Sequence, residues 1–291
     1  METTKRVTRV QSTALHFFYK IGYIDAMTRL CFCLCFLPLF SLHADDPLLI
    51  AHRGMLRHAP ENTLPAFACC LDLGMGFELD IRTTKDGKLV VLHDATLART
   101  TDGPARPVTE LTWDKLRELD AGSWFDSRFS GLRVPSLEET FTLIRERKRG
   151  PTLIALNIKG ITTEGERELV RLLEKFELFE ESFAFDQSVE CSQRLQALDT
   201  RIQIGRNIRR EDLDSQLAED AIDVFLLTFV PNEVEVSLLR KHKKTILFNY
   251  AGEGEHRREE KNWLRVREVG IDGMLTDYPL DCALLWRNTE K

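Results

Sequence analysis

The sequence lacks the basic stretches that are typical of proteins that bind nucleic acids. Its 40 lysine and arginine residues are outnumbered by 46 aspartate and glutamate residues, which gives a net charge of −6 and a pI near 5.7. A nucleic-acid-binding domain usually carries a basic patch and a pI above about 9, so we expect no nucleic-acid partner. A phosphate-bearing substrate stays possible, because the local field at a site matters more than the total charge.

Cysteine patterns typical of zinc sites are also absent. Three of the seven cysteines, at positions 31, 33 and 35, lie within one short apolar run, and the others are Cys69, Cys70, Cys191 and Cys282. Their spacing does not match a metal-binding motif. Two adjacent cysteines in a helix are poorly placed to form a disulfide with each other. We therefore expect the last four to act as small buried apolar side chains.

No apolar run near the N-terminus is long enough to span a bilayer. The run 31–40 is too short for a membrane helix, but Arg29 precedes it and the segment 41–44, Ser-Leu-His-Ala, follows it. These three parts resemble a secretory signal peptide. We expect translation to start at Met27 and cleavage to follow Ala44, so that residues 1–44 are an extension and 45–291 the mature domain. This predicts export to the periplasm or the outside, without a membrane span after cleavage; the alternative is a membrane anchor.

From residue 47 onward, short apolar runs alternate with amphipathic stretches. Such alternation predicts a parallel sheet covered by helices, and a single α/β barrel needs about 250 residues. We therefore predict a single-domain (β/α)8 TIM-type barrel. The nine candidate strands are Leu48–Ala51, Phe77–Ile81, Leu89–His93, Leu153–Ile158, Phe183–Phe185, Ile202–Ile204, Val224–Leu227, Thr245–Asn249 and Gly273–Leu275. One of them must be a hairpin partner or an extra strand, and residues 94–135 read as a small insertion after the third strand.

Residues that can perform chemistry follow the early strands. His52-Arg53-Gly54 closes the first candidate strand, Glu78 and Asp80 lie on the second, and His93 closes the third. Side chains two residues apart on a strand point to the same face, so the two carboxylates are expected to converge. Because catalytic groups of α/β barrels come from several strand ends on one face, this distribution predicts an active site.

The residue types suit the cleavage of a phosphodiester. Two imidazoles, His52 and His93, can remove one proton and donate another near neutral pH. Carboxylate oxygens favour Mg²⁺ or Ca²⁺, and Arg53 can grip a phosphate with its planar fork, with Lys159 as a second positive charge. Taken singly, a histidine at a strand end is more often structural, and a Glu-x-Asp pair is often a solvated strand face; the combination is what favours a phosphate-handling metal site.

The order of several motifs closely resembles the glycerophosphodiester phosphodiesterase family. They are His52-Arg53-Gly54, Pro60-Glu61-Asn62-Thr63, Glu78-Leu79-Asp80, Val90-Val91-Leu92-His93-Asp94, Gly270-Ile271-Asp272-Gly273 and Thr276-Asp277-Tyr278-Pro279. The resemblance implies a modified (β/α)8 barrel with acid–base histidines at His52 and His93. It implies a divalent cation at Glu78 and Asp80, and a phosphate contact at Arg53. The implied substrates are deacylated phospholipids, cleaved to glycerol 3-phosphate and an alcohol.

Two positions depart from the family pattern. Where relatives carry a third metal-binding glutamate two residues before a lysine, this chain has Asn157 before Lys159. An amide oxygen can ligate Mg²⁺ or Ca²⁺ but brings no charge, so we expect a weaker site, with Asp186 as a substitute ligand or, alternatively, as a cap of the following helix. Where relatives commonly have Trp-Thr, this chain has Phe248-Asn249, which alters an aromatic side chain suited to a choline headgroup.

Three functions are compatible with these residues. The first is a metal-dependent hydrolase of a small phosphodiester. The second is a lyase of the sphingomyelinase D type, which makes a cyclic phosphate and stops there. The third is a barrel that binds phosphate-bearing ligands without turning them over, which the uncharged Asn157 makes possible.

Overall fold

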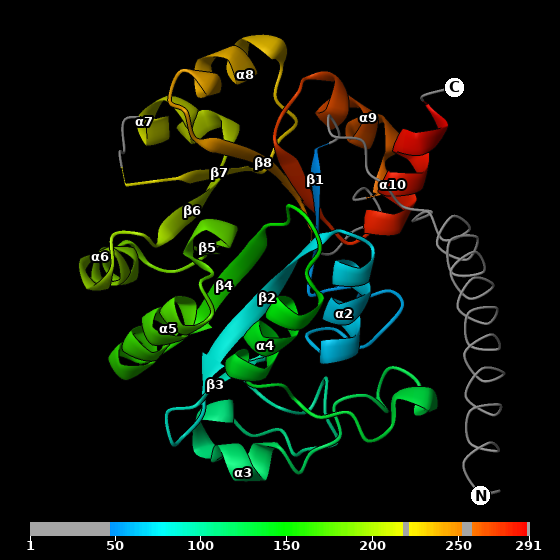
Figure 1. Cartoon of the computed structure of the whole chain (residues 1–291), viewed down its shortest axis with the longest axis vertical. Helices are drawn as coiled ribbons and strands as arrows, with labels where there is room; N and C mark the ends of the chain where they lie inside the picture. Colours follow the sequence, from blue (N-terminus) through cyan, green and yellow to red (C-terminus); the bar gives the residue numbers. More distant parts are fainter. Residues whose placement is uncertain (1–46, 218–220, 252–257, 290–291) are drawn as a thin grey trace, which may run out of the picture. The chain divides into compact units, whose positions relative to one another are not determined.

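The computed structural model describes residues 47–217, 221–251 and 258–289, which belong to one compact unit, Leu42–Lys291 (Figure 1). The expected signal peptide, with its start at Met27 and its cleavage after Ala44, lies outside the described residues and stays a prediction. Within the described ranges, no helix combines the length and the apolar character needed to cross a membrane.

Eight parallel strands form a closed barrel, as the sequence predicts. The barrel closes because β1 pairs with both of its neighbours: Ile50 lies opposite Gly76 of β2 and opposite Leu275 of β9. The strands in barrel order are β1 (Leu48–Ala51), β2 (Gly76–Thr83), β4 (Ile154–Gly160), β5 (Ser182–Phe185), β6 (Gln203–Ile208), β7 (Val224–Leu227), β8 (Thr245–Tyr250) and β9 (Gly273–Thr276).

The ninth strand is a hairpin partner and does not belong to the barrel. β3 (Leu89–Val91) runs antiparallel to the end of β2, with Val91 opposite Ile81. The chain turns at Gly87, whose φ of 84° suits glycine. His93 therefore does not close a barrel strand. The hairpin instead leads the chain back along β2, where the Leu92 N–H donates to the Asp80 carbonyl at 2.9 Å, and this return brings His93 to the barrel mouth.

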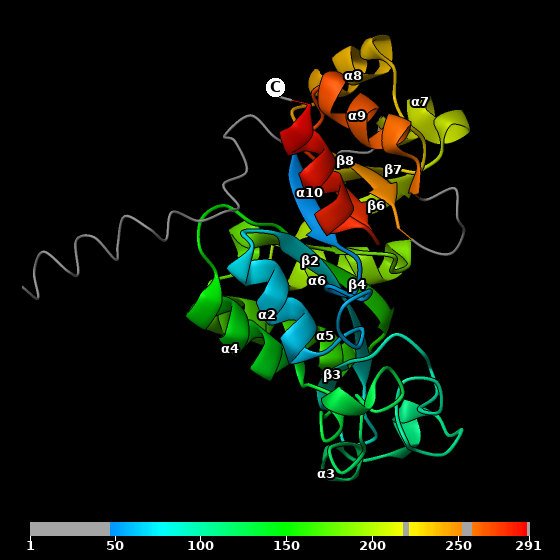
Figure 2. The same ribbon diagram turned by 90° about the vertical axis from the view of Figure 1, so that its right-hand side faces the viewer.

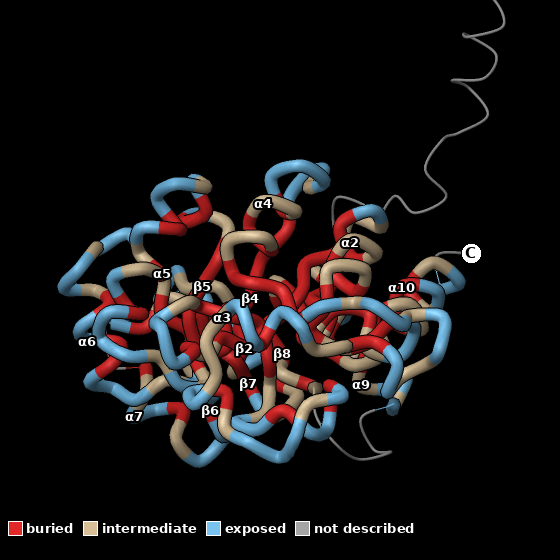
Figure 3. The backbone as a smooth tube through the Cα atoms, turned by 90° about the horizontal axis from the view of Figure 1, so that it is seen from below, coloured by how far each residue is buried: buried red, intermediate tan, exposed pale blue. Residues whose placement is uncertain are grey.

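Helices cover the outside of the barrel. They are α2 (Leu64–Asp72), α4 (Leu137–Arg147), α5 (Thr163–Lys175), α6 (Val189–Leu198), α7 (Leu213–Leu217), α8 (Glu233–Arg240), α9 (Glu260–Glu268) and α10 (Pro279–Asn288). Local sequence signals begin several of them: Ser136 and Glu139 form a capping box at α4, and Thr162 caps α5. Figure 3 shows buried residues along the strands and exposed residues on the outer turns.

Alternate residues of each strand point into the barrel, where they fill it. The inner cluster consists of Ile50, Leu153, Ala155, Phe183, Phe185, Val224, Leu226, Leu247 and Leu275. The other face of each strand packs against the helices in a larger apolar layer. Polar side chains at the carboxyl ends of the strands therefore lie above an apolar plug, which is the arrangement that α/β barrels use for their active sites.

Residues 94–135 form the expected insertion after β3 and have a small core of their own. They contain the short helices η1 (Val108–Glu110), α3 (Trp113–Leu116) and η2 (Ser127–Phe129). Leu97, Val108, Leu116, Ala121 and Val134 of the insertion form this core together with Val90 and Leu92 of the β3 segment. Figures 1 and 2 both show α3 beyond the end of the β2–β3 hairpin. The insertion thus lies on the side of the barrel to which His93 returns.

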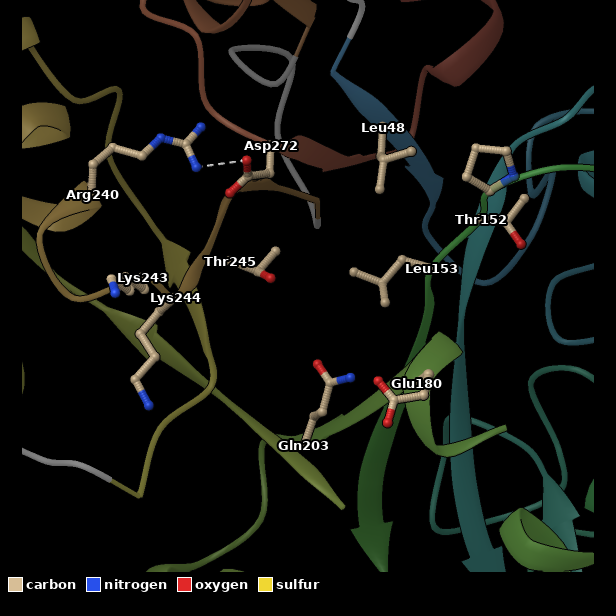
Figure 4. Close-up of a pocket in the computed structure, with 11 residues that line it drawn as sticks. Leu48, Thr152, Leu153, Glu180, Gln203, Arg240, Lys243, Lys244, Thr245 and Asp272 are labelled. Carbon is tan, nitrogen blue, oxygen red and sulfur yellow. Dashed lines mark hydrogen bonds and ion pairs between the residues drawn. The ribbon is translucent and has the colours of Figure 1, made fainter. Parts of the chain in front are cut away.

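At the opposite end, aspartates that precede two strands tie neighbouring strands together. Asp272 accepts a hydrogen bond from the Ile246 N–H at 2.7 Å and pairs with Arg240 at 2.7 Å. Asp223 accepts from the Ile204 N–H at 2.9 Å. A cavity of about 540 Å³ opens between these amino ends of the strands (Figure 4). The active sites of α/β barrels lie at the carboxyl ends of the strands. We therefore do not assign this cavity to the active site.

Replacing Asp272 by alanine is expected to lower the free energy of unfolding by about 2–3 kcal/mol, because a charged acceptor to a backbone N–H is lost and that N–H is left unpaired. Asp72→Ala is the control, since Asp72 makes an exposed ion pair with Arg147 that is worth about 1 kcal/mol or less. Urea denaturation measures both. Equal losses in the two variants would show that Asp272 does not hold β8 to β9.

Candidate active site

His52 is held by an aspartate that directly follows the last strand of the barrel. It follows β1, and its backbone N–H donates to the Thr276 carbonyl at 3.0 Å. Its Nδ1 lies 2.6 Å from Asp277, 225 residues further along the chain. Burial lowers the pKa of His52, but the hydrogen bond to Asp277 and the charges of Glu78 and Asp277 outweigh it, so the pKa lies above its ordinary value. With Nδ1 donating to a carboxylate, Nε2 is the nitrogen left for a substrate.

His93 is held in the same manner by its own neighbour. Its Nδ1 lies 2.8 Å from Asp94, and Arg82 donates two hydrogen bonds to the His93 carbonyl. Arg99 grips both oxygens of Asp94, at 2.7 and 2.8 Å. The hydrogen bond from Arg99 holds the pKa of Asp94 well below its usual range. Asp94 therefore stays ionised and keeps the His93 ring oriented, again with Nε2 available.

Arg53 connects the two halves of the site. Its backbone has a φ of 53°, in the left-handed region, and its N–H donates to Glu78 at 2.9 Å. Its guanidinium donates to Glu61 at 3.0 Å and lies 3.5 Å from Asp80. Glu61 in turn accepts two hydrogen bonds from Arg99, so the network runs from His93 to the loop after β1. The Arg53 guanidinium, which the sequence analysis assigns to phosphate binding, is thus already partly engaged by carboxylates.

Glu78 and Asp80 converge as their spacing predicts. Both are fully buried on β2. Burial and the neighbouring charge of Asp80 raise the pKa of Glu78 to about 7. Asn62 donates to Asp80 at 2.7 Å from a loop position with a φ of 57°, a conformation that asparagine tolerates better than most residues.

Three buried oxygens around these carboxylates have no hydrogen-bond partner: Oε1 of Glu78, Oδ1 of Asp80 and Oδ1 of Asn157. Asn157 lies directly opposite Asp80 in the register of β4 and β2. Buried polar atoms are normally hydrogen-bonded, so three buried oxygens without a hydrogen bond on two adjacent strands are suited to a bound cation, although Lys159 Nζ lies 3.8 Å from Oδ1 of Asp80. The described part of the chain has no cluster of three His, Cys, Asp or Glu side chains suited to a metal. The three oxygens belong to two carboxylates and the amide of Asn157. Carboxylate and amide oxygens are ligands that fit Mg²⁺ or Ca²⁺.

Lys159 lies beside this group and binds Asp186. Its Nζ is 2.9 Å from Asp186 and 3.8 Å from Asp80. The interpretation of Asp186 as a helix cap is wrong, because Ser188 caps α6 by accepting a hydrogen bond from the Cys191 N–H. Asp186 lies two residues too early for that role. The role of Asp186 as a metal ligand stays a prediction. A metal bound there would share the Asp186 carboxylate with Lys159.

The far side of the barrel mouth carries two amides. Asn249 of β8 donates to Asn207 of β6 at 2.7 Å, and both side chains point inward. Phe248, in contrast, is buried on the outer face of β8, where it stacks on Tyr250 at 4.8 Å between ring centroids. Because successive side chains on a strand face opposite ways, the aromatic residue of the Phe248-Asn249 pair points away from the mouth.

The sequence interpretation assigned no role to Asp277, Glu61 or Arg99. Asp277 stands directly after the last strand, as His52 stands after the first. In a closed barrel the first and last strands are neighbours, so the position of Asp277 directly after the last strand predicts that it lies near His52. Glu61 and Arg99 lie in loops, and no strand register predicts where their side chains meet.

Comparison with known proteins places these features in a family. Residues 52–281 match the model of the glycerophosphoryl diester phosphodiesterase family. A glycerophosphodiester phosphodiesterase from Caldanaerobacter subterraneus is 32% identical over 242 residues, which cover 80% of this chain and 94% of that protein. One from Bacillus subtilis is 29% identical over 262 residues, which cover 82% and 86%.

Solved structures share the fold. A glycerophosphodiester phosphodiesterase from Agrobacterium tumefaciens superimposes with a TM-score of 0.71 at 27% identity, covering 82% of this chain and 99% of that one. A phosphodiesterase from Oleispira antarctica, solved in complex with the product sn-glycerol-3-phosphate, gives a TM-score of 0.66 at 23% identity, covering 84% and 98%.

Proposed function

The chain belongs to the glycerophosphoryl diester phosphodiesterase family, and we propose on this basis that it hydrolyses glycerophosphodiesters to glycerol 3-phosphate and a free alcohol. Its activity is that of a glycerophosphodiester phosphodiesterase. The finer proposal is that His52 and His93 move the protons and that Glu78, Asp80 and Asn157 hold a divalent cation.

The observation that carries this proposal is the group of three unpaired oxygens next to two oriented histidines. Glu78, Asp80 and Asn157 each have a buried oxygen without a hydrogen-bond partner, and they lie on strands that pair with each other. A cation bound there would neutralise charge that builds up on the phosphate in the transition state. The residues present fit Mg²⁺ or Ca²⁺ better than a softer metal, because all three donors are oxygens.

The two histidines supply complementary proton transfers. Cleavage needs one proton taken from the attacking nucleophile and one given to the departing alkoxide, and a water molecule supplies the oxygen that the monoester product gains. Asp277 and Asp94 fix the Nδ1 atoms of His52 and His93, so each ring works through Nε2. Arg53 and Lys159 add positive charge beside the phosphate position. Because both cations also contact Asp80, the binding of a metal and of a phosphate is expected to be coupled.

A single experiment separates the three candidate functions. The purified full-length chain is incubated with glycerophosphodiesters and Mg²⁺ or Ca²⁺, and phosphorus NMR follows the products. Hydrolysis gives the monoester glycerol 3-phosphate, a cyclising lyase accumulates a cyclic phosphodiester, and a binding protein leaves the substrate unchanged. We expect the monoester. A cyclic product that persists, or no turnover with any divalent ion, would contradict the proposed reaction.

A further inference from the structure

The carboxylates that surround the two histidines and Lys159 are each already bound to a cation or to a histidine ring. Glu61 binds Arg53 and Arg99, Asp94 binds Arg99 and His93, Asp186 binds Lys159, and Asp277 binds His52. A substrate arm with a positive charge would have to compete with these side chains for a carboxylate. The histidine side of the mouth therefore favours uncharged substrate arms.

Aromatic rings at the ends of the strands also offer little to a quaternary ammonium, which binds over an open ring face. Phe185 and Phe248 are only 3% and 1% exposed. Tyr278, next to Asp277, is approached by two guanidinium groups: Arg57 lies 4.6 Å and Arg258 lies 5.5 Å from the ring centroid. These cations occupy the ring and would repel a cationic headgroup.

What the opposite side of the mouth does offer is a pair of carboxamides. The inward positions at the ends of β6 and β8 are Asn207 and Asn249, joined by one hydrogen bond. Asn249 Oδ1 also accepts weakly from the Ala251 N–H at 3.3 Å. Each amide carries two donor hydrogens and one acceptor oxygen, so the pair retains donors and acceptors for a ligand. A neutral group with several hydroxyls matches this combination.

We propose that the preferred substrates are glycerophosphodiesters whose headgroup is a neutral polyol, such as glycerol or inositol, and that the Asn207–Asn249 amide pair selects this headgroup. The inference rests on the proposed function, because it assumes that the histidine side of the mouth holds the phosphate. The diester then lies across the mouth, with one arm over the amide pair. Choline and ethanolamine esters find neither a free carboxylate nor an open ring at the strand ends described above.

The test compares kcat/KM of the full-length protein for glycerophosphoinositol, glycerophosphoglycerol and glycerophosphocholine. The polyol diesters are expected to be used on the order of tenfold better, which corresponds to one or two additional hydrogen bonds. Equal or better use of glycerophosphocholine would overturn the inference and leave the proposed function standing. If none of the three diesters is cleaved with any divalent ion, the proposed function itself is wrong.

Two variants test the amide pair directly. Asn207→Ala should lower kcat/KM for the polyol diesters by on the order of tenfold and change that for glycerophosphocholine by less than about twofold. Asn249→Asp keeps the size of the side chain and adds a charge, and the Asn207 amide can rotate to donate to it. This variant should raise the ratio of choline to inositol diester use by on the order of tenfold.

Asn288→Asp is the matched control, because Asn288 is exposed at the end of α10 and the change adds the same charge away from the mouth. Its substrate ratio should equal that of the unaltered protein. If Asn207→Ala lowers use of all three diesters equally, the pair binds the glycerol arm that they share, and the proposed selection of the headgroup is wrong. If the ratio in Asn249→Asp matches that in Asn288→Asp, the amide pair does not face the headgroup.

Discussion

Replacing His52 by alanine is expected to lower kcat/KM for a glycerophosphodiester by about 100- to 10,000-fold, the usual contribution of a positioned acid–base group. The imidazole that Asp277 orients is lost, and with it the Nε2 atom that is proposed to transfer a proton. Steady-state kinetics with the full-length protein measure the effect. Circular dichroism confirms that the barrel is still folded.

His58→Ala is the matched control for this prediction. His58 lies in the same loop after β1 and is exposed, and it is not part of the hydrogen-bond network that reaches His93. Its replacement should change kcat/KM by less than about threefold. Similar losses in the two variants would mean that the loop, and not the His52 imidazole, is what the reaction needs. Asp277→Asn should lie between the two, since it keeps the ring but weakens its orientation.

Removal of divalent cations with EDTA is expected to lower activity by at least about 100-fold, because charge neutralisation by a metal contributes several kcal/mol to such reactions. Asp80→Asn should produce a comparable loss by removing one of the two buried charges. Calorimetric titration with Mg²⁺ and Ca²⁺ checks binding independently of turnover. Activity that survives both EDTA and Asp80→Asn would rule out the metal.

Asn157→Asp tests the third oxygen in the opposite direction. The change is nearly isosteric and adds a charge directly across from Asp80, so divalent affinity should rise by about tenfold. Asp186→Asn tests the substitute ligand: if Asp186 also binds the cation, divalent affinity should fall as in Asp80→Asn, and an unchanged affinity would show that Asp186 binds only Lys159. If Asn157→Asp leaves the affinity unchanged, Asn157 does not face the cation.

Periodic patterns made most of the barrel predictable from the sequence. The strands β1 and β7 have the bounds that the apolar runs predict, because each run is short and flanked by polar residues. The strand β2 begins one residue before its predicted start, at Gly76, and ends two residues beyond its predicted end, at Thr83. Its extra residues, Arg82 and Thr83, gain pairing partners from β3. That pairing depends on tertiary contacts that the local pattern does not encode.

The candidate site was predictable where residues follow strands and unpredictable where loops fold back. His52, Glu78 and Asp80 follow from strand ends and the two-residue period. Asn62 and Arg53 depend on left-handed backbone conformations, and these become favourable only once the loop packs around Asp80. The contact between Asp277 and His52 can likewise be predicted only if the barrel is known to be closed, because closure makes β9 a neighbour of β1.

The closure of β1 against β9 has a consequence for the synthesis of the protein. His52 is made early, but its partner Asp277, which follows β9, is made 225 residues later. Until β9 has emerged from the ribosome, the sheet of a nascent chain has two open edges, on β1 and on β8. Open edges can pair with strands of other chains. Products that terminate before β9 should therefore be inactive and prone to aggregate, and only a chain that includes β9 and Asp277 can assemble the site.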